Sequence, residues 1–300
     1  MQADVIKREA EDGTELFGLV HEADGERDLA VIYVHGLGST ARSHVSQGLA
    51  AVLPRAGIGL IRGDLREADL LHIDELPNAG EARKGGGAYH PFAAGVADVD
   101  VWVREALERG YQRIVLFGHS LGSLRSTHYV ADRGRPELVG LVLASTADLI
   151  AMHESRYTED ELERFLAMAG SMVAEGNGDE IMPTECSVGL MRQPISAAAY
   201  VDRFGLQPSW DVMDLYERGS DRAFRALSEV QVPILATFGT QKETIPADRV
   251  DAVFELLAKQ AARTPSFTSH TFEGAEHFYL GFSEQLAELT RDWISERVLR

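Results

Sequence analysis

Short apolar runs alternate with amphipathic helical patterns along most of the chain. An uninterrupted run such as Leu-Ala-Val-Ile-Tyr-Val at residues 29–34 is typical of a strand buried on both faces of a parallel sheet. Strand patterns occupy residues 5–10, 15–21, 29–34, 59–62, 113–117, 138–144, 233–238 and 266–272; helical patterns occupy 43–56, 92–107, 121–133, 247–262 and 283–298. The alternation predicts an α/β fold with a mostly parallel sheet flanked by helices.

Two segments interrupt this alternation. Residues 63–91 are polar, and we expect them to form a long loop of the kind that is functional or mobile. Residues 148–229 have helical patterns without clear strand runs, and they contain every methionine after the first residue. The sequence therefore predicts a core domain of residues 1–147 and 230–300 and a helical cap of residues 148–229. Some of the methionines would line a pocket between them.

The strongest chemical signal is Gly-His-Ser-Leu-Gly at residues 118–122, between a predicted strand and a predicted helix. This spacing matches the G-x-S-x-G nucleophile elbow, in which small residues relieve the crowding of a sharp turn. The pattern predicts Ser120 as the nucleophile. It also predicts that the amide N–H of Leu121, at the start of the helix, faces a developing oxyanion.

Two further motifs complete this pattern. His-Gly-Leu-Gly at residues 35–38 follows a buried strand, and we expect the amide of Leu37 to be the second oxyanion donor while His35 orients the turn. Gly-Ala-Glu-His at residues 274–277 follows the last predicted strand. A histidine suits proton transfer because its ordinary pKa is near neutrality, so His277 is predicted to be the general base.

Together these motifs resemble the α/β-hydrolase superfamily, in its serine esterase and lipase-like form with a helical cap, along nearly the whole chain. The matching pieces are residues 35–36, 118–122, 233–246 and 274–277. The resemblance implies an eight-stranded sheet, a catalytic triad in the order Ser, acid, His, and a cap inserted between strands six and seven.

The acid departs from the family's pattern. Relatives usually carry Asp three residues after the glycine that ends strand seven, but Lys242 occupies that position and cannot accept the imidazole proton. Glu243, one residue later, is the first candidate, and Asp148, which follows strand six, is the second. Glu276 is a further candidate, and a chain without any triad acid is the remaining alternative.

The predicted function is hydrolysis of a small or medium carboxylic ester, lactone or thioester through an acyl-enzyme on Ser120. The alternatives are an amidase, peptidase or C–C bond hydrolase with the same triad, and a catalytically degenerate protein that only binds a ligand. No cofactor and no metal is expected. Arg62, Arg83 and Lys84 could bind a substrate carboxylate, although a solvated loop is the favoured interpretation.

Charge and composition restrict the partners. The formal charge of −18 opposes binding to nucleic acid or to an anionic membrane surface. Cys186 is the only cysteine, and we expect a structural thiol. No apolar run approaches the ~20 residues of a membrane helix, and no apolar signal core opens the chain, so a cytoplasmic protein is expected. A small acyl substrate is the expected partner; the oligomeric state stays open, with a homodimer as one option.

Overall fold

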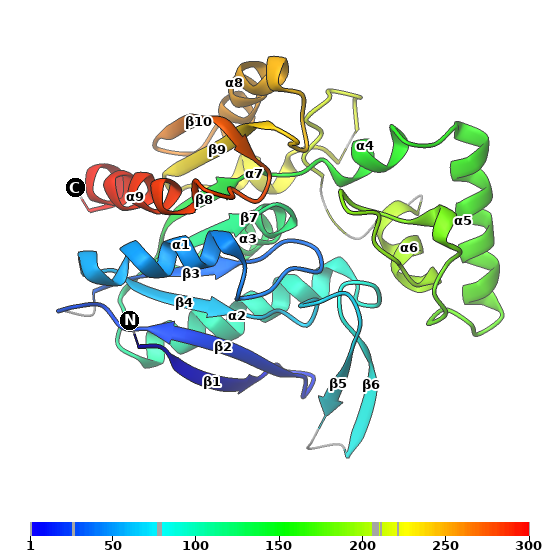
Figure 1. The fold of residues 1–300 in the computed structure, drawn as a ribbon, viewed down its shortest axis with the longest axis horizontal. Coiled ribbons are helices and arrows are strands. Elements are labelled where there is room, and N and C mark those ends of the chain that lie inside the picture. The colour runs from blue at the N-terminus through cyan, green and yellow to red at the C-terminus, as the bar shows by residue number, and fades with distance from the viewer. Residues whose placement is uncertain are drawn as a thin grey trace.

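The computed structural model describes residues 2–25, 28–76, 80–205, 210, 212–220 and 222–299. Its main sheet has eight strands in the order β1-β2-β4-β3-β7-β8-β9-β10 (Figure 1). The pairs β1–β2 and β2–β4 are antiparallel, and every other neighbouring pair is parallel. The expectation of a mostly parallel, eight-stranded sheet is therefore confirmed.

The elements lie close to the ranges that the sequence predicts. The strands are β1 (Asp4–Glu9), β2 (Glu15–His21), β3 (Leu29–Val34), β4 (Gly59–Gly63), β5 (His72–Leu76), β6 (Glu81–Gly85), β7 (Arg113–His119), β8 (Leu138–Ala144), β9 (Ile234–Gln241) and β10 (Phe267–Glu276). The helices are α1 (His44–Val52), α2 (Phe92–Glu108), α3 (Leu121–Arg133), α4 (Leu149–Glu154), α5 (Glu159–Ala174), α6 (Ala197–Phe204), α7 (Arg225–Glu229), α8 (Val250–Gln260) and α9 (Ser283–Trp293), with shorter turns at Pro54–Ala56, Thr184–Cys186, Ala247–Arg249 and Ile294–Val298. Within the described ranges, no helix is both long enough and apolar enough to cross a membrane.

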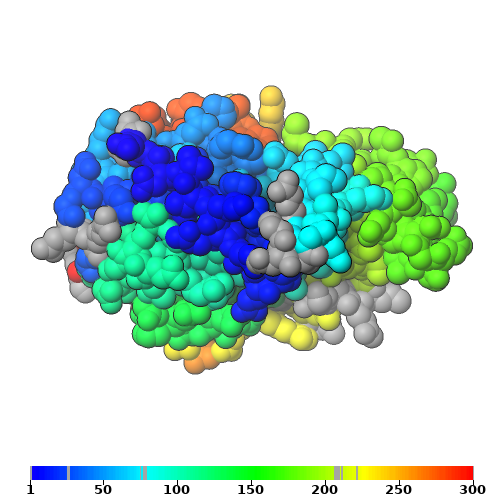
Figure 2. Space-filling model, turned by 90° about the horizontal axis from the view of Figure 1, so that it is seen from below, coloured from blue at the N-terminus to red at the C-terminus, as the bar shows by residue number. Residues whose placement is uncertain are grey.

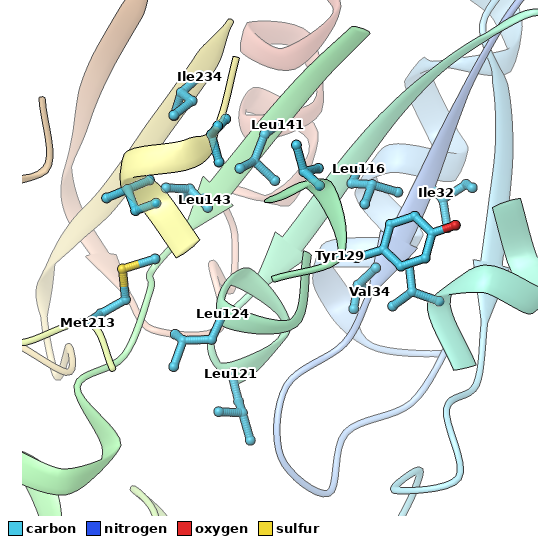
Figure 3. Close-up of a cluster of buried hydrophobic side chains, with 14 of the residues drawn as sticks. Ile32, Val34, Leu116, Leu121, Leu124, Tyr129, Leu141, Leu143, Met213 and Ile234 are labelled. Atoms are coloured by element: carbon cyan, nitrogen blue, oxygen red, sulfur yellow. The ribbon is translucent and has the colours of Figure 1, made fainter. Parts of the chain in front are cut away.

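The central strands are buried on both faces, as their uninterrupted apolar runs predict. All six residues of β3 are buried, and alternate side chains enter different clusters: Ala30, Ile32 and Val34 on one face and the other three on the opposite face. Helices α2, α3 and α8 cover the first face, whereas α1 and α9 cover the second. Figure 3 shows the first cluster, in which Leu121 and Leu124 of α3 pack below the strands.

The prediction of an unbroken loop over residues 63–91 is wrong. Strands β5 and β6 form an antiparallel hairpin there, which lies between the N-terminal strands and the cap region in Figure 2. Its stability comes partly from charged contacts, since Asp74 binds Arg83 Nε at 3.0 Å and His72 Nε2 at 2.8 Å. A hairpin stabilised in this way has no hydrophobic period for sequence analysis to detect.

The segment between β8 and β9 has two parts with different packing. Helices α5 and α6 stand beside the sheet (Figure 1) and form a separate apolar cluster that contains Phe165, Cys186 and Tyr200. The later part of the segment, which includes Trp210 and Val230, contributes instead to the main core, where α7 packs on α3. The division into a core and a cap of residues 148–229 stays a prediction, and the packing favours a smaller cap that ends near α6.

A buried ion cluster joins the α5–α6 region to the core. Glu67 pairs with Arg125 of α3 and, at 3.2 Å, with Arg203 of α6; all three side chains are at most 1% exposed. Arg125 also donates to the carbonyl of His35, and Arg203 to the carbonyl of Gly87. Burial lowers the pKa of Arg125 to about 9 and that of Arg203 to about 10. Glu67 is the carboxylate that pairs with both arginines, and Asp202 also favours the charged form of Arg203.

We predict that Glu67→Gln destabilises the protein by about 3–5 kcal/mol, because it removes the carboxylate that pairs with two buried guanidinium groups. The free energy of unfolding in urea measures this effect. Glu180→Gln, which removes the exposed partner of Lys84, is the matched control and should change the unfolding free energy little. Equal effects of the two variants would contradict the stabilising role of the cluster.

Candidate functional site

Ser120 occupies a strained turn between β7 and α3. Its backbone has φ 55° and ψ −125°, a conformation that costs a non-glycine residue about 1–3 kcal/mol. The turn needs glycine on both sides, because a Cβ at Gly118 would collide with the backbone of Gly122 and Ser123, and one at Gly122 with the carbonyl oxygen of Val34. The G-x-S-x-G spacing thus follows directly from the close approach of α3 to β3 and β7.

A cavity of about 220 Å³ opens at Ser120, and His277 lines it as well. The cavity lies between the core and the segment that follows β8, from which Met152 and Met191 contribute. Its apolar lining consists of Leu37, Leu121, Ala147, Leu149, Met152, Leu190, Met191 and Phe278; its polar side chains are those of Ser39, His119, Gln193 and Thr244 besides Ser120 and His277. Ser120 therefore faces a largely apolar chamber.

His277 follows β10 directly, and its Nδ1 lies 3.0 Å from Oε2 of Glu243. Both side chains are almost completely buried, at 4% and 1% exposure. The Glu243 carboxylate also accepts hydrogen bonds from the amides of Gly239 at 3.0 Å and Thr244 at 3.1 Å, and from the Ser145 hydroxyl. Burial alone would raise the pKa of Glu243, but hydrogen bonds from His277 and Ser145 outweigh it and hold this pKa below its usual value.

The backbone explains how Glu243, one residue later than the position that the resemblance implies, reaches His277. Lys242 is exposed and has a left-handed φ of 45°, so the chain turns there and Glu243 enters the interior. The other candidates bind elsewhere. Asp148 caps α4 through the amide of Ala151 and pairs with Arg218 at 3.1 Å.

Glu276 binds within its own loop, because its carboxylate accepts hydrogen bonds from the amides of Phe278 and Leu280. Of the three carboxylates that the sequence proposes, the structure therefore places Glu243 against His277.

The loop after β3 packs directly against Ser120. A Cβ at Gly36 would lie 2.8 Å from the Cβ of Ser120, so only glycine fits there. Gln193 donates to the carbonyl of Leu37 at 3.2 Å and fixes the loop from the cap side. His35 accepts from the amide of Leu65 through Nε2, and burial lowers its pKa to about 3, so it is neutral and structural. The oxyanion role of the Leu37 and Leu121 amides stays a prediction.

Sequence analysis missed three residues that support the Glu243–His277 pair. His119 Nε2 donates to the carbonyl of His277 at 2.8 Å, and burial lowers the pKa of His119 to about 3, which keeps it neutral. Ser145 binds Glu243, and the Tyr279 hydroxyl lies 2.9 Å from Ser145 Oγ. The sequence offers only their positions as a signal of this role: one lies beside the elbow, one follows β8 and one follows His277.

The basic residues of the 62–84 region are engaged away from the cavity. Arg62 binds His21 Nε2 at 2.8 Å, Arg83 pairs with Asp74, and Lys84 pairs with Glu180 at 3.2 Å. None of the three lines the cavity, so they do not form the carboxylate site considered above. In the part of the chain that the structure describes, no three His, Cys, Asp or Glu side chains are grouped to hold a metal ion.

The pH dependence of stability offers a test of the Asp148 environment. Burial raises the pKa of Asp148 from 3.8 to about 6, so the folded state binds this proton more tightly than the unfolded state. The resulting stability is present below pH 4 and is lost as the pH rises through 6.

We therefore expect the unfolding free energy of the wild type, relative to Asp148→Asn, to fall by roughly 2 kcal/mol between pH 4 and 7. Urea unfolding of both proteins at the two pH values measures it. A difference that grows with pH would show that the pairing with Arg218 dominates instead.

Comparison with solved structures places this architecture in a known fold. Est1E from Butyrivibrio proteoclasticus, with ferulic acid bound, superimposes with a TM-score of 0.67 at 15% identity and covers 98% of this chain and 100% of its own. The α/β hydrolase GrgF from Penicillium sp. sh18 has a TM-score of 0.67 at 14% identity, with 100% of both chains covered. A thermostable carboxyl esterase from Bacillus coagulans, in complex with glycerol, has a TM-score of 0.65 at 15% identity over 99% of both chains.

The molecule has the α/β-hydrolase fold, as the sequence motifs imply. It belongs to the DUF1749 family, described as proteins of unknown function, whose model matches residues 99–300. No curated protein matches the sequence.

Proposed function

We propose that the protein is a serine hydrolase in which Ser120 is the nucleophile, His277 the general base and Glu243 the acid that orients it. One observation carries this proposal: the buried Glu243–His277 pair and the strained Ser120 turn meet at a single apolar cavity. A carboxylate on Nδ1 fixes the imidazole tautomer whose Nε2 can accept a proton.

The first half of the reaction forms an acyl-enzyme. Ser120 Oγ attacks the carbonyl carbon of the substrate, and its proton passes to Nε2 of His277. The amides of Leu37 and Leu121 stabilise the negative charge that develops on the carbonyl oxygen. When the bond to the leaving group breaks, His277 returns the proton to the leaving oxygen.

The second half releases the acid. A water molecule attacks the acyl carbon while His277 takes one of its protons. The bond to Ser120 Oγ then breaks, and the same proton restores the serine hydroxyl. Every atom and proton is accounted for without a cofactor in these steps.

The lining of the cavity favours an uncharged acyl substrate. Among the described residues that line it there is no Lys or Arg, so they offer no cationic side chain of that kind to a free carboxylate or phosphate. The proposed substrates are small or medium carboxylic esters, lactones or thioesters. The carboxyl esterase among the neighbours and the ferulic acid bound to Est1E support the ester class.

A fluorophosphonate probe tests the nucleophile. We expect it to label the wild type and not Ser120→Ala, because only an activated serine attacks the phosphorus. Intact-protein mass spectrometry measures the adduct. Absence of labelling in a folded wild type would favour the alternative of a catalytically degenerate ligand-binding protein, whereas hydrolysis of amide or β-diketone panels in preference to esters would favour the other enzyme classes.

The acid is tested by two isosteric changes. Glu243→Gln should lower turnover of an ester by up to about 10⁴-fold, because the amide favours the wrong imidazole tautomer. Asp148→Asn should affect turnover little, since its carboxylate binds Ala151 and Arg218 rather than His277. Initial rates with a chromogenic ester measure both, and the reverse order would reassign the triad.

Lys242→Asp provides the matched control, because it places an acid at the position usual for relatives. Position 242 is exposed, so this change should leave turnover close to wild type and should not rescue Glu243→Gln when the two are combined. Rescue in the double variant would show that the loop rearranges and that the backbone at Lys242 does not decide the position of the acid.

A further inference from the structure

A second cavity, of about 360 Å³, adjoins the site cavity. Three residues line both: Ser39, His119 and Phe278. The second cavity is lined in addition by Leu280 and by Ser43, His44 and Val45 at the start of α1. The proposed hydrolysis of an acyl group assigns no role to this space.

Two polar groups of this lining already make hydrogen bonds within the protein. His119 Nε2 donates to the carbonyl of His277, and the hydroxyl of Ser43 accepts from the amide of Ser46 at 3.2 Å as the cap of α1. Because burial keeps His119 neutral, no charge reaches the cavity from its ring. The surface offered to a ligand is therefore mainly hydrocarbon, from Phe278 and Leu280, with the exposed His44 beside them.

The loop after His277 holds the two largest of these side chains outward. Tyr279 has a left-handed φ of 54° and a fully buried side chain, so the chain turns at that residue. Phe278 and Leu280, on either side of it, are 37% and 49% exposed, and the Glu276 carboxylate fixes both of their amides. Two large apolar side chains thus remain in contact with water on a well-anchored turn, and an apolar ligand that covered them would gain free energy.

The direction of proton transfer decides which part of a substrate reaches this surface. The leaving oxygen must lie close to His277, because it receives its proton from that imidazole. Phe278 follows His277 directly, and their rings lie 5.1 Å apart between centroids. The group attached to the leaving oxygen is therefore directed toward Phe278 and Leu280, whereas the acyl group has the chamber lined by Leu37, Met152 and Met191.

We propose that the second cavity binds the apolar alcohol portion of an ester, with Phe278 separating it from the acyl chamber. This inference rests on the proposed hydrolase function and makes it more specific: the substrate is an uncharged ester with hydrocarbon on both sides of the scissile bond. Leu280 contributes to selectivity for the alcohol and not to the chemical steps.

Two ester series test the inference in the full-length protein. The first keeps butyrate as the acyl group and varies the alcohol from methyl to hexyl; the second keeps ethanol and varies the acyl chain. In the wild type, kcat/KM should rise with alcohol length. Leu280→Ser should lower the ratio of kcat/KM for hexyl butyrate to that for methyl butyrate by about 4- to 15-fold, the effect of losing the burial of one or two methylene groups. The dependence on acyl length should not change.

Leu71→Ser is the matched control, because Leu71 is similarly exposed, at 54%, and lines neither cavity. It should leave the hexyl-to-methyl ratio at the wild-type value.

A second measurement uses the acyl-enzyme itself. With methyl butyrate as donor and hexan-1-ol added, the alcohol competes with water for the acyl group and forms hexyl butyrate. Leu280→Ser should reduce the fraction of acyl groups transferred to hexanol.

The outcomes separate the two proposals. If Ser120-dependent hydrolysis occurs but Leu280→Ser changes neither the ester ratio nor the transfer to hexanol, the second cavity is not the alcohol site and only this inference is overturned. An equal loss with methyl and hexyl esters overturns it too. If no ester of either series is hydrolysed faster by the wild type than by Ser120→Ala, the proposed function fails and this inference fails with it.

Discussion

The contact between Gly122 and the carbonyl group of Val34 constrains the rest of the site. A side chain at position 122 would collide with that oxygen, so the N-terminus of α3 can lie directly over the end of β3. This proximity forces Ser120 into its strained backbone and brings it against Gly36 of the neighbouring loop. Ser120 and the predicted oxyanion loop are therefore positioned by the same packing contact.

Strain of this kind recurs along the carboxyl edge of the sheet. Ser120, Ser145, Lys242 and Tyr279 follow the consecutive strands β7, β8, β9 and β10, and all four have φ between 45° and 55°. Each residue costs free energy in this conformation, so the surrounding packing must stabilise it. Three of them support the Glu243–His277 pair: Ser145 binds Glu243, Tyr279 binds Ser145, and Lys242 turns the chain so that Glu243 enters the interior.

The parts of the fold that depend on the hydrophobic pattern and on motif spacing could be predicted from the sequence. The eight main strands, the helices that flank them and the elbow at residues 118–122 follow from local signals that tertiary packing reinforces. The β5–β6 hairpin was missed, because Asp74, Arg83 and His72 stabilise it by charge and leave no alternating apolar face. The choice between Glu243 and Asp148 could not be made either, since it depends on the backbone at Lys242 and on a partner, Arg218, seventy positions away from Asp148.

The Glu67–Arg125–Arg203 cluster has a consequence for how this molecule can change during evolution. Its members belong to the loop after β4, helix α3 and helix α6, and each is buried. A replacement of the α5–α6 region that carries no arginine at position 203 would leave Glu67 and Arg125 without the second arginine, and loss of the carboxylate at position 67 would leave Arg203 without this partner. The α5–α6 region and the rest of the fold are thus not freely interchangeable. The shape of the cavity would change more readily through substitutions at its wall, such as at Met152 or Met191, than through exchange of the whole α5–α6 region.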